Sequence, residues 1–178
     1  KPFTVMSCDN LPSNGQKLHA ILVKLAGFRS AEFASFIETE VACPSTMIDR
    51  IVPKTTDEDR AVAQEALQLK DAWPIATEPF TQWVIEDCFP EGRPAWEKFG
   101  AELVDDVAPY EAMKLKLLNA SHTSLAFLGS LAGYRTVADS MNDPVIGDFI
   151  TRFMAEDVTH ILTIPPKADV KAYATSLV

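Results

Sequence analysis

The segment from Tyr110 to Leu131 restricts the fold of this chain most, because its pattern fits only a long helix. Leucines and alanines recur at three- and four-residue spacing, which is the period of an amphipathic helix. Pro109 suits a first helical turn, and Gly133 suits a helix end. Similar patterns follow over 144–162 and 168–178. The second half of the chain is therefore predicted to be mostly helical.

Four polar residues stand where this helix should present apolar groups. A buried lysine is costly and readily loses its proton, so its amine can act as a base. A neighbouring amide and imidazole can donate hydrogen bonds to a substrate oxygen. The pattern leaves two interpretations open, a catalytic site or core polar groups that bond to one another. On a helix that advances about 100° per residue, Lys114, Ser121 and His122 share the face of Leu118 and Leu125. Asn119 lies at the edge of that face.

Charge and cysteine content exclude several classes of protein. The net charge is −9, whereas nucleic-acid binding needs clustered Lys and Arg. No apolar run has the length of a membrane span. Cys8, Cys43 and Cys88 form no C-x-x-C pair and indicate buried, reduced thiols in a cytoplasmic protein. The three histidines lack zinc-site spacing, so we expect no catalytic metal.

The first half of the chain mixes short strands with helices. Asn14 is a candidate cap for the first helix, and Thr56 or Asp57 for the third. A strand that ends near residue 87 is interrupted by Pro79. The expected helices cover about 16–27, 31–38 and 57–69, and the expected extended segments cover 3–7, 41–52, 74–87 and 102–104.

Several runs resemble a known family. Its active-site motif, Lys-x-x-x-x-Asn-x-Ser/Gly-His, matches residues 114–122, and four further runs agree in the same order: Phe3–Pro12, Met47–Pro53, Glu78–Asp87 and Gly92–Lys98. The chain is similar over its full length to the polyol-specific long-chain dehydrogenases, the family of mannitol 2-dehydrogenase and fructuronate reductase. No residue departs from the family pattern. The resemblance implies an oxidoreductase that uses NAD or NADP and no metal.

The resemblance also implies how the reaction is catalysed. Lys114 matches the general base, which takes the hydroxyl proton while hydride leaves for the nicotinamide. Asn119 matches an amide that polarises the reacting oxygen, and Asn10 matches its partner across the site. Two amides directed at one developing alkoxide form an oxyanion hole.

Three further residues have implied or candidate roles around the substrate. His122 and Asp49 match residues that bind substrate hydroxyls. Glu111 lies one turn before Lys114 and is a candidate proton relay to solvent. An acidic residue near a helix start is also favourable without any catalytic role, so for Glu111 both interpretations stay open.

The resemblance predicts the domain organisation. Residues 1–40 are expected to be the C-terminal part of a Rossmann-type, dinucleotide-binding α/β domain, and residues 41–178 the beginning of a mostly helical substrate domain with long helices from about residue 109. No G-x-G-x-x-G turn occurs, so the cofactor-binding residues are unknown. We expect an internal fragment, α+β overall, that does not turn over alone.

The substrate is expected to be a linear polyol or sugar acid, with mannitol/fructose and mannonate/fructuronate as the main candidates. The runs 49–53 and 134–139 look closer to the fructuronate reductase branch. An arginine or lysine would bind a substrate carboxylate, and Arg50 is one candidate. The alternative function is a non-catalytic helical interaction module, which predicts that Lys114, Asn119 and His122 are exposed and dispensable. The oligomeric state is not predicted.

Overall fold

The computed structural model describes residues 1–165 and 168–177. The chain divides into two compact units, Lys1–Asp105 and Asp106–Val178. The domain boundary that the sequence predicts near residue 40 stays a prediction. Within the first unit, residues 41–42 pair with its first strand, and Thr46 bonds to its first helix.

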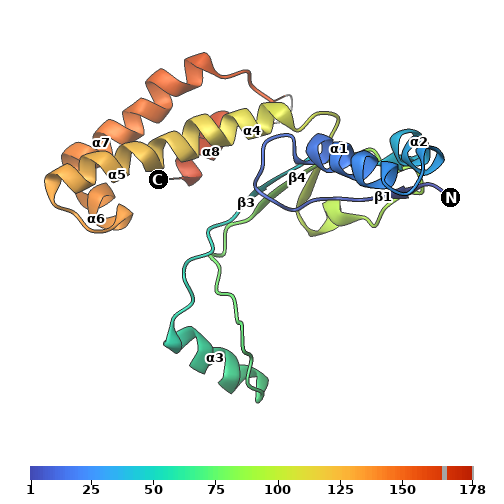
Figure 1. Cartoon of the computed structure of the whole chain (residues 1–178). Helices are drawn as coiled ribbons and strands as arrows, with labels where there is room; N and C mark the ends of the chain where they lie inside the picture. Colours follow the sequence, from blue (N-terminus) through green and yellow to red (C-terminus); the bar gives the residue numbers. More distant parts are fainter. Residues whose placement is uncertain (166–167, 178) are drawn as a thin grey trace. The chain divides into compact units, whose positions relative to one another are not determined.

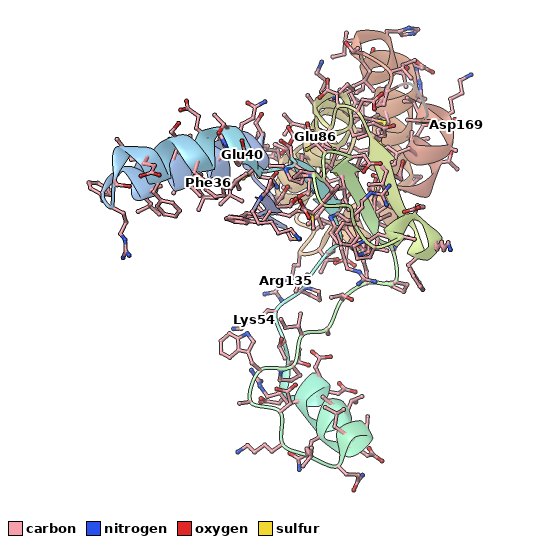
Figure 2. The ribbon with its side chains drawn as sticks, turned by 90° about the vertical axis from the view of Figure 1, so that its right-hand side faces the viewer. Phe36, Glu40, Lys54, Glu86, Arg135 and Asp169 are labelled. Atoms are coloured by element: carbon pink, nitrogen blue, oxygen red, sulfur yellow. The ribbon has the colours of Figure 1, made fainter. Side chains whose placement is uncertain are left out.

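The first unit opens with a pair of parallel strands joined through two helices. Strand β1 (Phe3–Thr4) pairs with β2 (Val41–Ala42), and the chain between them forms α1 (Asn14–Gly27) and α2 (Ala31–Glu40). This strand–helix–strand connection is the expected α/β arrangement. Figure 2 shows α2 with Phe36 and Glu40. The helices and strands share a small core around three buried residues, Ala26, Ile37 and Val41.

The expected strand at residues 41–52 divides into β2 and β3 (Thr46–Asp49). Strand β3 pairs antiparallel with β4 (Gln82–Glu86), and β4 pairs in parallel with β5 (Ala101–Val104). Val84 and Ile85 of the central strand are fully buried. The strand expected from residue 74 begins only at Gln82, because residues 74–81 belong to a connection outside the sheet.

An arm of residues 50–81 joins β3 to β4 and carries α3 (Asp57–Leu67) (Figure 1). Helix α3 begins with a capping box in which Thr56 and Asp59 bond to each other's backbone N–H groups. The base of the arm is held by Ile51, whose N–H donates to a Glu78 carboxylate oxygen at 2.6 Å. Thr55 donates from its hydroxyl to the carbonyl of Pro74 at 2.9 Å.

The second unit is helical in the described residues. Its first helix is continuous from Ala108 to Ala132 but contains a π-helical segment: α4 (Ala108–Lys114), η2 (Leu115–Asn119) and α5 (Ala120–Ala132). Gly133 ends α5 with a positive φ of 88°, as its position predicted. No helix in the described part of the chain is both long and apolar enough to cross a membrane.

The rest of this unit packs on that helix. Gly129 of α5 lies so close to Ser140 of α6 (Val137–Asn142) that a side chain at residue 129 would collide with it. Helix α7 (Pro144–Arg152) continues into a second π-helical segment, η3 (Phe153–Val158), and a 3-10 turn, η4 (Thr159–Ile161). The two π segments lie against each other. Helix α8 (Val170–Ser176) is capped by Asp169, and the final residue of the helix expected over 168–178 lies outside the described residues.

Candidate active site

Lys114 lies at the end of α4 and is buried, with 7% of its surface exposed. Its neighbours Tyr110, Met113 and Leu117 are at most 1% exposed. A lysine in such surroundings is uncommon, because removing an ammonium group from water costs several kcal/mol. The burial that the helix pattern predicted for Lys114 is therefore confirmed.

The π segment begins directly after Lys114 and changes the geometry of the motif. The N–H of Ala120 bonds to the carbonyl of Leu115, five residues back, so this turn holds one more residue than an α-helical turn. Such a turn advances roughly 85° per residue instead of about 100°. Asn119 then lies roughly 65° around the axis from Lys114 instead of about 140°, and His122 lies roughly above Lys114 instead of about 80° away.

The same π turn keeps the buried residues on one side of the helix. Met113, Leu117, Ser121, Leu125 and Gly129 are all buried and recur every four residues. In a pure α-helix, such a row drifts by about 40° at each step. The π turn lies between Met113 and Ser121, and its extra residue reduces this drift. Lys114 and His122 therefore come to one edge of the buried side. His122 is half-buried and Asn119 is exposed.

Two other groups on this helix bear on the candidate site. Glu111 is half-buried in the turn before Lys114, and roughly 60° from it around the axis. Ser121 is 4% exposed, and its hydroxyl oxygen has no hydrogen-bond partner among the described residues. A buried hydroxyl usually has a partner, so this oxygen is an exception to the usual pattern. The sequence placed Ser121 on the polar face without giving it a role.

Asn10 lies in the first unit, in an exposed loop between β1 and α1. The loop is held at two points: the carbonyl of Ser7 accepts from the Thr46 hydroxyl at 2.7 Å, and the carbonyl of Asp9 accepts from the Asn14 amide at 2.9 Å. Asn14 was expected to cap α1, but Ser13 occupies the cap position. Asn14 bonds to strand β3 instead, and so fixes the loop that carries Asn10.

Asp49 is the last residue of β3 and is 4% exposed. It lies opposite Gln82 in the antiparallel register, at the end of the sheet from which the arm departs. Since Asn14 bonds to Thr46 on the same strand, the loop of Asn10 and the strand of Asp49 are held by one set of hydrogen bonds. The first unit thus supplies two of the expected site residues on linked elements.

Arg50, considered as a carboxylate-binding residue, bonds within the arm. Its Nε donates to the carbonyl of Phe80 at 3.1 Å, and its Nη2 donates to the carbonyl of Pro79 at 3.4 Å. These bonds close the base of the arm beside β4. Lys116, on the same helix as Lys114, donates from its Nζ to the carbonyl of Ile161 at 3.1 Å.

The expected site residues thus fall into two groups. The structure brings Lys114, Asn119 and His122 to one side of a helix in the second unit, with Glu111 in the preceding turn. Asn10 and Asp49 lie in the first unit. The first unit is an α/β unit, and the helical unit that follows it in the chain carries the buried lysine.

Comparison with known proteins identifies the family. The profile of a family described as the mannitol dehydrogenase Rossmann domain matches residues 1–98, and that of the mannitol dehydrogenase C-terminal domain matches residues 106–178. The chain belongs to the mannitol dehydrogenase family. The predicted fold, the tail of a Rossmann-type domain followed by a mostly helical domain, is confirmed.

Individual relatives agree with this assignment. A D-mannonate oxidoreductase of Escherichia coli is 46% identical over 100% of this chain and 37% of its own length. A mannitol dehydrogenase of Saccharomyces cerevisiae is 44% identical over 99% of this chain and 35% of its own length. The chain therefore spans little more than a third of these relatives.

Two solved structures are similar to this one. Mannitol 2-dehydrogenase of Pseudomonas fluorescens, in a ternary complex with NAD and D-mannitol, has a TM-score of 0.79 and 46% identity over 99% of this chain and 36% of its own. A D-sorbitol dehydrogenase in substrate-free form has a TM-score of 0.91 and 38% identity over 98% of this chain and 36% of its own.

Proposed function

We propose that the intact protein is an NAD- or NADP-dependent oxidoreductase that interconverts a secondary alcohol and a ketone on a linear polyol or sugar acid. The observation that carries this proposal is the buried Lys114, with His122 and Asn119 brought to its side of the helix by the π turn. The names of the relatives, which include mannitol dehydrogenases and a D-mannonate oxidoreductase, support the substrate class.

The cofactor is not held by a phosphate-binding turn in this chain. The sequence contains no G-x-G-x-x-G run, and its seven glycines are spread over the whole chain. The residues present therefore do not supply a pyrophosphate site, and we propose that the activity belongs to the intact protein and not to these 178 residues alone.

In the proposed reaction, the amine of Lys114 takes the proton of the substrate hydroxyl as the carbon is oxidised. A general base in contact with the reacting oxygen typically contributes a factor of about 10²–10⁴ to the rate. Glu111, in the preceding turn, passes this proton on to solvent. The lysine needs no metal ion to lower the barrier to deprotonation.

The amides of Asn119 and Asn10 are proposed to donate hydrogen bonds to the substrate oxygen as negative charge develops on it. Loss of one such donor typically costs about 10²–10³ in kcat. His122 and Asp49 bind neighbouring hydroxyls and so orient the chain of the substrate. For Asn10 and Asp49 these roles depend on the family resemblance, and for Asn119 and His122 the helix geometry supports them as well.

A Lys114→Met variant of the intact protein tests the base. We expect kcat to fall about 10²–10⁴-fold, with partial recovery on addition of a small primary amine, measured by the absorbance of the nicotinamide. Lys116→Met is the matched control on the same helix and is expected to retain most of the activity. Unchanged kcat in Lys114→Met would remove the lysine from the mechanism. Activity that disappears with a chelator and returns with a divalent cation would contradict metal independence.

The same assay, run with mannitol and mannonate and with both cofactors, identifies the substrate. The runs 49–53 and 134–139 favour mannonate as the substrate, because they look closer to the fructuronate reductase branch. Arg50 adds no support to a carboxylate substrate, because the donors described above are directed at carbonyls of the arm. A higher kcat/KM for mannonate than for mannitol would support the fructuronate reductase branch.

A non-catalytic interaction module is not favoured. That function predicts that Lys114 is exposed and replaceable, whereas 7% of its surface is accessible.

A further inference from the structure

Cys43 and Cys88 lie at the same end of the β3–β4 pair, Cys43 before the start of β3 and Cys88 after the end of β4. The antiparallel register pairs Thr46 with Ile85 and Met47 with Val84. Beyond the ladder, the N–H of Glu86 still donates to the carbonyl of Ser45 at 3.0 Å. Cys43 comes two residues before this bond and Cys88 two residues after it, and the chain turns at Cys88, whose N–H donates to the carbonyl of Glu86 at 3.0 Å.

A disulfide at this end of the pair requires the two cysteines to approach as closely as residues within the ladder. Residues that face each other in an antiparallel ladder have Cα atoms about 4.5–5.5 Å apart. A disulfide needs Cα atoms about 4.4–6.8 Å apart. A second contact fixes this end of the pair, since the carboxylate of Glu86, labelled in Figure 2, accepts from the N–H of Ser45 at 2.8 Å.

Electrostatics also indicates that the thiols are close. Burial raises the pKa of Cys43 above its usual value, and repulsion from the Cys88 thiolate raises it further, while the Val5 N–H lowers it. Burial raises the pKa of Cys88 as well, with additional repulsion from Glu86 and Asp87. The sequence predicted buried, inert thiols, but Cys88 is exposed and Cys43 is half-buried, so reagents can reach the pair.

We propose that Cys43 and Cys88 form a dithiol site that closes to a reversible disulfide by exchange with a low-molecular-weight disulfide. One cysteine thiolate attacks the reagent disulfide, which gives a mixed disulfide and releases one reagent thiol. The other cysteine then attacks the protein sulfur of that mixed disulfide and releases the second reagent thiol. The two cysteines lose two electrons in total, and the reagent disulfide is reduced to two thiols.

The bond would tie the start of β3 to the end of β4. Residues 44–87, which include β3, the arm with α3 and β4, would then form a closed covalent loop. A loop of this length limits the unfolded chain, so the oxidised protein should unfold at a higher temperature than the reduced protein. Because the site is exposed, the bond should also reopen with a monothiol reductant. This proposal is independent of the catalytic function.

The test is equilibration of the intact protein in glutathione buffers of increasing oxidised fraction, followed by alkylation, trypsin digestion and mass spectrometry. We expect one linked species that joins peptide 30–50 to peptide 71–98 and disappears on reduction. Its formation should coincide with a rise of several degrees in the unfolding midpoint. Cys8, in peptide 1–17, should appear alkylated or as a mixed disulfide.

Single variants separate pairing from general thiol reactivity. In Cys43→Ser or Cys88→Ser, the remaining thiol should stop at the mixed disulfide, while the matched control Cys8→Ser should still form the 43–88 link. Two separate mixed disulfides in the native wild-type protein would overturn the proposal. So would equal yields of the link in native protein and in protein unfolded by urea.

Discussion

Asn14 and Thr46 bond to each other in both directions across the first unit. The amide oxygen of Asn14 accepts from the Thr46 N–H at 2.8 Å, and its amide nitrogen donates to the Thr46 hydroxyl at 2.9 Å. Both residues are buried, with 2% of their surfaces exposed. Because Asn14 begins α1 and Thr46 begins β3, these bonds join the helix to the strand, and they fix the loop of Asn10 between them.

Replacing Asn14 by alanine should destabilise the first unit by roughly 2–3 kcal/mol, because buried polar groups of Thr46 lose their partner. The unfolding midpoint of the intact protein measures this loss. Asn142→Ala, which removes the same amide from an exposed position in α6, should leave the midpoint nearly unchanged. If Asn14 also positions Asn10, kcat should fall at temperatures where the variant is still folded. Equal midpoints for the two variants would show that the Asn14–Thr46 bonds contribute little.

Gly15 and Gly27 lie on the same helix and should respond in opposite directions to alanine. A Cβ at residue 15 would lie 2.6 Å from the N atom of Ser45 and 2.7 Å from the carbonyl carbon of Pro44, which are backbone atoms that cannot easily move. Gly15→Ala should therefore cost about 2 kcal/mol or more. A Cβ at residue 27 meets no atom within 4 Å, so Gly27→Ala should be neutral or should stabilise by up to about 1 kcal/mol. Thermal unfolding of both variants tests whether residue 15 must be a glycine because α1 packs closely against the backbone of residues 43–45.

The sequence predicted those helix ends that are fixed by residues within a few positions of the end. Helix α3 begins at Asp57 because Thr56 and Asp59 cap it within three residues, and α5 ends at Gly133 because glycine adopts a positive φ. The role of Asn14 was missed, since its partner lies 32 residues away in the chain. The strand predicted from residue 74 failed for a similar reason, because only packing distinguishes the arm from the sheet.

The candidate site was predicted in part. Burial of Lys114 followed from its place on a leucine-rich face, and the structure confirms it. The relation of Asn119 to Lys114 was wrong in angle, because the sequence carries no clear signal for the π turn over 115–119. Such a turn forms where packing against a neighbour, here η3, compensates for its poorer local geometry. The pairing that we propose for Cys43 and Cys88 depends on the pairing of β3 with β4 and could not be predicted from spacing.

Asp143 should make the second unit sensitive to acid. Its carboxylate accepts from the N–H groups of Ile146 and Val145 at the start of α7 and from the Tyr134 hydroxyl. The bond from Ile146, followed by that from Tyr134, lowers the pKa of Asp143 below its usual value. A lowered pKa in the folded state means that this stabilisation is complete above the ordinary pKa of about 4 and is lost as the pH falls through the folded value.

The measurement compares the unfolding midpoint of Asp143→Asn with that of the wild-type protein between neutral and acidic pH. The variant should be the less stable protein at pH 7, and the difference should shrink below about pH 4. Asp148→Asn is the matched control on the same helix, where the acid is exposed. A difference that stays constant into acid would show that the charge of Asp143 does not contribute to the cap.

Ser121 and Ser140 are both buried, but they should differ in what their hydroxyls contribute. Ser140 donates to the carbonyl of Thr136 at 3.0 Å, whereas the oxygen of Ser121 has no partner in the described part of the chain. Removing a bonded hydroxyl costs about 0.5–1.5 kcal/mol, and removing an unsatisfied one is neutral or stabilising. Ser140→Ala should therefore lower the unfolding midpoint, while Ser121→Ala should leave it unchanged or raise it. A midpoint that falls equally in both variants would mean that a protein group outside the described residues bonds to Ser121.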